Sequence, residues 1–133
     1  MNIKYKLNKD ITEDEFIEIL SHSSLGKRRP LDNLKIIKGM IQNADVIITA
    51  TIDDKIIGVA RAVTDFSFCC YLSDLAVHEN YQKQGIGQKL IAKVKEQLED
   101  NCNIILLAAP AATKYYSKVG FTQHNSAWTS IKF

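Results

Sequence analysis

The 133-residue chain contains only two prolines and three cysteines, and it has no long apolar run. No stretch approaches the roughly 20 consecutive apolar residues that a membrane-spanning helix needs. The first ten residues, MNIKYKLNKD, alternate charged with apolar side chains and lack the apolar core of a secretory signal. These absences predict no membrane association and no secretion by the usual route, so we expect a cytoplasmic location.

The three cysteines, Cys69, Cys70 and Cys102, are odd in number and lack CxxC spacing, which argues against a disulfide framework and against a zinc site. The formal net charge of +2 is too small to predict electrostatic binding of nucleic acid. The basic cluster at residues 27–29 is either a solvated loop or a contact for ligand phosphates or an acidic substrate. We therefore expect no metal and no nucleic-acid partner.

Short apolar or alternating runs mark the predicted strands, and apolar residues at helical spacing mark the predicted helices. The predicted strands cover residues 3–7, 45–52, 55–63, 68–77 and 103–109, with one or two more after 121. The predicted helices begin at a capping box formed by Thr12 and Glu15, and further cover residues 31–43, 85–99 and 110–120. The strand at 103–109 is expected to be buried. This order predicts one mixed α/β domain over residues 1–133.

Gly85 and Gly87 lie in the string QKQGIG, directly after the predicted strand that ends in DLAV. The string lacks the GxxxxGK[ST] pattern of a P-loop, and Leu90 occupies the third position of a GxGxxG dinucleotide fingerprint. The remaining kind of phosphate site is a helix whose first turn has free backbone N–H groups. Glycine at such a turn lets a bulky anion approach closely. The two glycines therefore predict an anion site at a helix start.

This string resembles the Q/R-x-x-G-x-G/A hallmark of the Gcn5-related N-acetyltransferases. Downstream, AAPAATKYYSKVGF resembles a second segment of that family, in which a tyrosine precedes Gly-Phe by four residues. The likeness covers residues 45 to 122 and suggests a small single-domain, bacterial-type member. It implies an α/β (α+β mixed) fold: a mixed, mostly antiparallel sheet of six to seven strands flanked by about four helices.

The resemblance implies acetyl-CoA as the cosubstrate. Its pyrophosphate would lie on backbone amides at the helix start, and its pantetheine arm would pair with the strand 68–77 where that strand splays from 103–109. The backbone amide of Val77, or one near it, would stabilise the oxyanion. The residues that the resemblance assigns to this cosubstrate are Leu75, Ala76, Val77, Gln82, Lys83, Gln84, Gly85, Ile86, Gly87, Gln88 and Tyr116.

The implied reaction is direct attack of a neutral amine on the thioester, in a ternary complex. Tyr116 matches the general acid of the family, whereas Tyr115 points about 100° away on the same helix and is expected to pack in the core. The base stays open, because Tyr71 stands where the histone-modifying branch carries a glutamate. Asp74 is a candidate for the base or a structural carboxylate, and a water chain could also relay the proton.

The acceptor is not identified by the sequence. His22, Arg29, Phe66 and Tyr71 are candidate substrate contacts, and the acceptor could be a small amine, such as an arylalkylamine or a polyamine, or an exposed amino group. A non-catalytic acyl-CoA-binding regulatory module is the alternative function. The terminal strands predicted after Phe121 could pair across a homodimer.

Overall fold

Five strands form one sheet whose spatial order, β1-β2-β3-β4-β5, follows their order along the chain. The computed structural model describes residues 2–131. The strands are β1 (Lys4–Leu7), β2 (Val46–Ile52), β3 (Lys55–Thr64), β4 (Cys69–Val77) and β5 (Asn103–Ile105). The first three neighbouring pairs are antiparallel, and β4 runs parallel to β5. The predicted mixed, mostly antiparallel sheet is confirmed.

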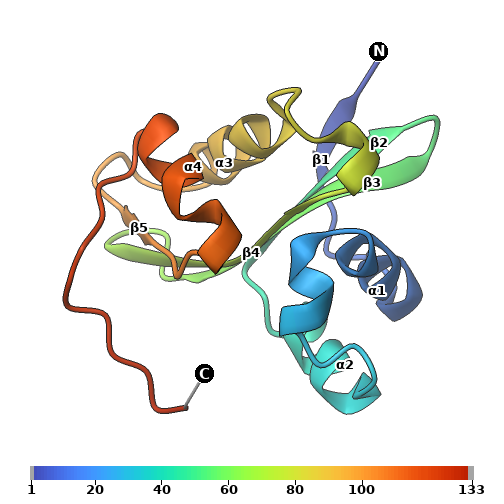
Figure 1. Cartoon of the computed structure of the whole chain (residues 1–133), viewed down its shortest axis with the longest axis horizontal. Helices are drawn as coiled ribbons and strands as arrows, with labels where there is room; N and C mark the ends of the chain where they lie inside the picture. Colours follow the sequence, from blue (N-terminus) through green and yellow to red (C-terminus); the bar gives the residue numbers. More distant parts are fainter. Residues whose placement is uncertain (1, 132–133) are drawn as a thin grey trace.

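Helices cover both faces of the sheet, with α1 and α2 on one face and α3 on the other (Figure 1). The described helices are α1 (Glu13–Ser21), α2 (Leu34–Gln42), α3 (Ile86–Glu96) and α4 (Thr113–Lys118), with short 3-10 helices η1 (Ser24–Arg28), η2 (Glu79–Tyr81) and η3 (Pro110–Ala112). The predicted capping box starts α1, because the Glu15 amide donates to Thr12 Oγ1 at 3.1 Å and the Thr12 amide donates to Glu15 Oε1 at 3.0 Å. The Asn33 side chain caps α2, which therefore begins at Leu34 rather than at residue 31.

Two apolar clusters form the core, one on each face of the sheet. On the α3 face, the buried side chains of the helix are those predicted from its spacing: Ile86, Leu90, Ile91 and Val94. On the opposite face, α1 and α2 bury Phe16, Ile19, Leu20, Ile37 and Ile41 against β2, β3 and β4. The helical periodicity of the sequence thus predicted both buried faces, except that Leu34, expected on the apolar side of α2, is 49% exposed at the first turn of the helix.

A β-bulge in β4 changes which side chains face which helices. Arg61 of β3 pairs with Asp74, but the next β3 residue pairs with Leu72, so Ser73 is the extra residue. Before the bulge, Leu72 lies in the cluster under α3, and after it Ala76 lies in the cluster under α1 and α2. The bulge therefore turns the Asp74 side chain toward the α1–α2 face.

Within residues 2–131 the sheet has five strands rather than the six to seven expected. β5 ends at Ile105 instead of residue 109, and it is partly exposed rather than buried, because it forms the sheet edge and has a strand partner on one side alone. The strands expected after 121 are absent up to residue 131, and Trp128 is 93% exposed. The polar run at residues 122–126 offers no apolar face that could dock on a neighbour. The pairing of these strands across a homodimer stays a prediction.

No helix within residues 2–131 is long and apolar enough to cross a membrane.

Candidate functional site

The two parallel strands β4 and β5 separate after three paired positions. The last pair is Tyr71 with Ile105. From Leu72 to Val77, β4 keeps β3 on one side but has no strand partner on the other among residues 2–131. This stretch therefore offers an unpaired strand edge, with backbone N–H and C=O groups that an extended ligand can use. It contains three residues predicted to bind the pantetheine arm, namely Leu75, Ala76 and Val77.

The unpaired edge leads into the loop that starts α3. The Gln82 side chain donates to the carbonyl of Val77 at 3.0 Å and so ties this loop to the end of β4. The first bond of the helix is the one from the Lys89 amide to the Gly85 carbonyl, at 3.1 Å. The amides of Ile86, Gly87 and Gln88 consequently have no backbone acceptor among the described residues. Free amides at the positive end of a helix dipole form an anion site.

The two glycines of this loop are required for different reasons. Gly85 has φ +81°, and nothing lies within 4 Å of a Cβ built on it, so its left-handed backbone alone favours glycine. A Cβ on Gly87 would instead lie 2.6 Å from the hydroxyl oxygen of Tyr115. Lys83 also has a left-handed backbone, with φ 65°. The loop is thus shaped by backbone conformation at two positions and by a close side-chain approach at a third.

Tyr115 and Tyr116 extend from α4 toward α3 and β4. Their ring centroids lie 5.2 Å apart in an edge-to-face arrangement, and the ring of Tyr116 packs edge to face on Phe121 with centroids 5.7 Å apart. Burial raises the pKa of both phenols, and Tyr115 adds to the rise at Tyr116, so both hydroxyls are protonated at neutral pH. The Tyr115 hydroxyl lies over Gly87, a position that the sequence did not predict. The sequence did contain a hint of this contact, because a second tyrosine directly precedes Tyr116, the residue predicted to be the general acid.

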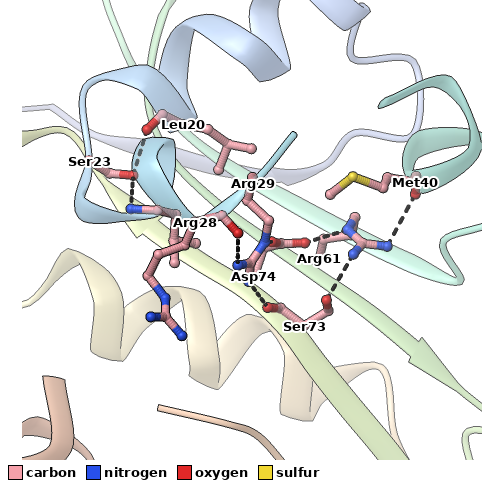
Figure 2. Close-up of polar contacts among 9 residues, drawn as sticks. Leu20, Ser23, Arg28, Arg29, Met40, Arg61, Ser73 and Asp74 are labelled. Carbon is pink, nitrogen blue, oxygen red and sulfur yellow. Dashed lines mark hydrogen bonds and ion pairs between the residues drawn. The ribbon is translucent and has the colours of Figure 1, made fainter. Parts of the chain in front are cut away.

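Asp74 lies between two arginines at the middle of β4 (Figure 2). The Nε of Arg29 donates to Asp74 Oδ1 at 2.6 Å, and the Nε of Arg61 donates to Asp74 Oδ2. Arg29 also donates to the Ser73 carbonyl, and Arg61 donates to the Ser73 hydroxyl, both at 2.8 Å. The Asp74 side chain is fully buried, while those of Arg29 and Arg61 are 21% and 10% exposed.

This cluster joins two residues that the sequence assigned to different tasks, Asp74 as a candidate base and Arg29 as a substrate contact. Both oxygens of Asp74 accept charged N–H groups, an arrangement that supports the structural alternative for this carboxylate. Its side-chain partners are two guanidinium groups. Arg61 was not predicted, although an arginine within the apolar run GVARAV signals a buried partner.

The other candidate substrate contacts lie at separate places. His22 stacks on His78 beyond the end of β4, with ring centroids 4.5 Å apart, and the pair lines a cavity of about 210 Å³ between α1 and the β2–β3 hairpin. Burial, helped by His22, lowers the pKa of His78. Tyr71 is seven residues before His78, about 20 Å along an extended strand. The exposed Phe66 lies in the β3–β4 loop. His22 therefore does not share a site with Tyr71.

A family model described as "Acetyltransferase (GNAT) domain" matches residues 18–130. The chain therefore belongs to the GNAT acetyltransferase family. Among solved structures, it is similar to SA2161 from methicillin-resistant Staphylococcus aureus, a probable acetyltransferase, with a TM-score of 0.81 and 21% identity over 99% of this chain and 100% of the other. Aminoglycoside N-acetyltransferase AAC(6')-Iy in complex with CoA gives a TM-score of 0.76 and 17% identity over 98% and 95%. These structures support the fold.

Two relatives share more of the sequence. The "Uncharacterized N-acetyltransferase ycf52" of Gracilaria tenuistipitata var. liui is 36% identical over 97 residues, which cover 71% of this chain and 53% of the relative. Its namesake in Pyropia yezoensis is 32% identical over 120 residues, which cover 86% of this chain and 67% of the relative. The chain thus spans between half and two thirds of the length of these relatives.

Proposed function

We propose that the protein, as one domain over residues 1–133, transfers the acetyl group of acetyl-CoA to a primary amine. The observation that carries this proposal is the unpaired edge of β4, residues 72–77, leading directly into the free amides of Ile86, Gly87 and Gln88. This arrangement fits a long ligand whose arm carries amide groups, which can pair with the edge of β4, and whose pyrophosphate can reach the start of α3. Membership of the GNAT family supports the same ligand.

The residues present fit acetyl-CoA at both of its ends. The pyrophosphate would lie on the first-turn amides of α3 and on the loop residues Gln82, Lys83 and Gln84, which are exposed. The side chain of Ile86 is buried in the core, so this residue would contact the pyrophosphate through its backbone amide alone. The pantetheine arm would pair with β4 between Leu75 and Val77, as an added strand does. No metal is needed for this binding mode, because the helix start supplies the positive potential.

The chemistry follows from a neutral amine in a ternary complex with the thioester. The amine nitrogen attacks the carbonyl carbon, a C–N bond forms, and the C–S bond breaks to leave CoA as a thiolate. A backbone amide between Leu75 and Val77 would donate to the carbonyl oxygen as negative charge develops there. The nitrogen loses its proton to solvent, and the thiolate takes a proton from the Tyr116 hydroxyl. The raised pKa of Tyr116 keeps that proton in place at neutral pH.

Calorimetric titration with acetyl-CoA, with CoA and ATP as controls, tests the binding part of the proposal. We expect acetyl-CoA and CoA to bind and ATP to bind far more weakly, because ATP lacks the pantetheine arm that pairs with β4. Folded protein that binds none of them would refute the proposed site. Binding without turnover of any amine in a thiol-release assay would instead indicate an acyl-CoA-binding module.

The adjacent tyrosines provide a matched pair for the catalytic part. We expect Tyr116→Phe to bind acetyl-CoA as the wild type does and to lose about tenfold or more in kcat, which is less than the roughly 100-fold usual for a general acid, because a thiolate leaving group needs only modest help. If Tyr115→Phe loses turnover and Tyr116→Phe does not, the phenol over Gly87 is the acid and the assignment to Tyr116 is wrong.

A further inference from the structure

The cluster of Arg29, Asp74 and Arg61 carries one surplus positive charge next to the unpaired edge of β4. Two guanidinium groups surround a single carboxylate, and the remaining partners are the neutral carbonyls of Met40 and Arg28 and the Ser73 groups. Asp74 directly precedes Leu75 on β4, where the thioester would lie. The surplus charge is mostly buried, so water screens it less than it would screen an exposed side chain.

An apolar row lies beside the cluster on the same face of the sheet. Arg61 and Val63 are two residues apart on β3, so both point to the α1–α2 face, about 7 Å from each other. Val63 pairs with Tyr71, and Tyr71 pairs with Ile105, so the three side chains form a row across β3, β4 and β5. They are 45%, 41% and 52% exposed. The row begins where β4 and β5 separate.

Two acidic side chains, Asp45 and Asp65, lie past Val63, at the end of the row away from the cluster, and the neutral amides that they accept leave the carboxylate charge in place. Asp45, before β2, accepts the Thr64 amide at 2.8 Å. Asp65, after β3, accepts amides of Ser67, Phe68 and Cys69, and these bonds, that of Phe68 first, lower its pKa. Neither acid contacts Arg29 or Arg61 among the described hydrogen bonds and ion pairs. In Figure 2 the side chain of Arg28 points away from Asp74.

We propose that the acceptor is a small amine with a single positive charge and an apolar body, which lies on the Val63–Tyr71–Ile105 row beside the arginine cluster. Next to the cluster, the surplus charge repels a second cationic group and so disfavours diamines and polyamines. It also disfavours the ammonium form of the bound amine, which promotes the neutral nucleophile without a dedicated base. This inference rests on the proposed acetyltransferase function and deepens it.

A comparison of two amines of equal size distinguishes the effect of the acceptor's charge from the effect of its size. Hexylamine and 1,5-diaminopentane have the same number of non-hydrogen atoms, but the second carries an extra ammonium group. At about 7 Å from a surplus charge that is only partly screened, this group should cost about tenfold or more in kcat/KM. Equal or better use of 1,5-diaminopentane by the wild-type protein would overturn the inference.

Neighbouring arginines supply a matched control for the cluster. Arg29→Gln removes the surplus charge, whereas Arg28→Gln removes an exposed charge one residue away. We expect Arg29→Gln to reduce the preference for hexylamine several-fold and to move the acid limb of the pH profile of kcat, measured at saturating amine, up by about one pH unit, since the bound amine then titrates nearer its solution pKa. Arg28→Gln should change neither. The same shift in both variants would assign the effect to overall charge and refute the cluster.

Asp74→Asn separates this role from general-base catalysis, because the two mechanisms predict opposite results. With two surplus charges, the acid limb of the kcat profile should move down in pH and the preference for hexylamine should rise. A base would instead lose about 100-fold or more in rate with both amines. If Asp74→Asn does not fold, Arg61→Gln repeats the test made with Arg29→Gln.

Acetyl-CoA titration of each variant keeps the two proposals apart. Acetyl-CoA binding without acetylation of either amine would overturn the acceptor inference and leave the cosubstrate site standing. Loss of acetyl-CoA binding by the folded wild-type protein would overturn the proposed function itself.

Discussion

Replacing Gly87 with alanine places a methyl group 2.6 Å from the Tyr115 hydroxyl oxygen, and nothing else lies within 3.4 Å of it. Alanine in a helix gains up to about 1 kcal/mol over glycine. Overpacking costs about 1–3 kcal/mol, since the hydroxyl sits on a rigid ring that can yield only if the side chain or α4 shifts. We therefore expect Gly87→Ala to lower the free energy of unfolding by about 1 kcal/mol.

Removing the hydroxyl should reverse the sign of this effect. In Tyr115→Phe the nearest remaining atom is the ring Cζ at 3.5 Å, an ordinary van der Waals contact. Gly87→Ala should then stabilise the protein by up to about 1 kcal/mol, which gives a coupling of about 2 kcal/mol in a double-mutant cycle. Urea denaturation of the four proteins measures this coupling.

Gly85→Ala is the matched control for the cycle. It should cost about 1–2 kcal/mol through its left-handed backbone, equally in the wild-type protein and in the Tyr115→Phe variant, because no side chain lies near it. A coupling below about 0.5 kcal/mol between Gly87 and Tyr115 would refute the argument, since that is the range in which independent sites add.

Further predictions concern the loop and two titrating groups. Lys83→Gly should be about 1 kcal/mol more stable than Lys83→Ala by urea denaturation, because only glycine relieves the left-handed φ, and equal stabilities would contradict this. The pKa of His78 is lowered by burial, so below the unfolded value of about 6.5 the unfolded chain binds more protons and stability falls as the pH falls. The midpoint of urea denaturation should therefore fall less between about pH 7 and about pH 5.5 in His78→Gln than in the wild type, whereas His124→Gln should behave as the wild type does. An equal fall in the wild type and in His78→Gln would show that His78 does not cause the pH dependence. Because burial raises the pKa of Tyr116 above its usual value, kcat should stay level to at least about pH 9.5, and a fall near pH 8 would point to another acid.

Much of the fold was predictable because its signals are local. The capping box of Thr12 and Glu15 sets the start of α1, and the spacing of Ile86, Leu90, Ile91 and Val94 sets the buried face of α3. The two aspartates of the β2–β3 turn, Asp53 and Asp54, adopt the positive φ that a tight hairpin turn requires. Such features depend on a few consecutive residues, so a single sequence contains them.

The errors lie where a strand depends on its neighbour. The apolar run at 103–109 reads as one buried strand, but its ladder ends at Ile105, because β4 and β5 separate there. The segment after Phe121 has strand-like composition in part and yet has no strand partner up to residue 131. Whether an apolar run becomes a strand is decided by pairing across the sheet, which composition does not encode.

The order of residues is enough to predict that a strand leads through two glycines into a helix start, and hence to propose an anion site of the acetyltransferase kind. What surrounds that site depends on the folded chain. The bulge at Ser73 turns Asp74 toward the α1–α2 face, and the loop after η1 brings Arg29 to it from 45 residues away in the chain. The approach of Tyr115 to Gly87 likewise depends on how α4 packs on α3. Contacts between distant residues are set by packing and register, and these emerge only when the whole chain has folded.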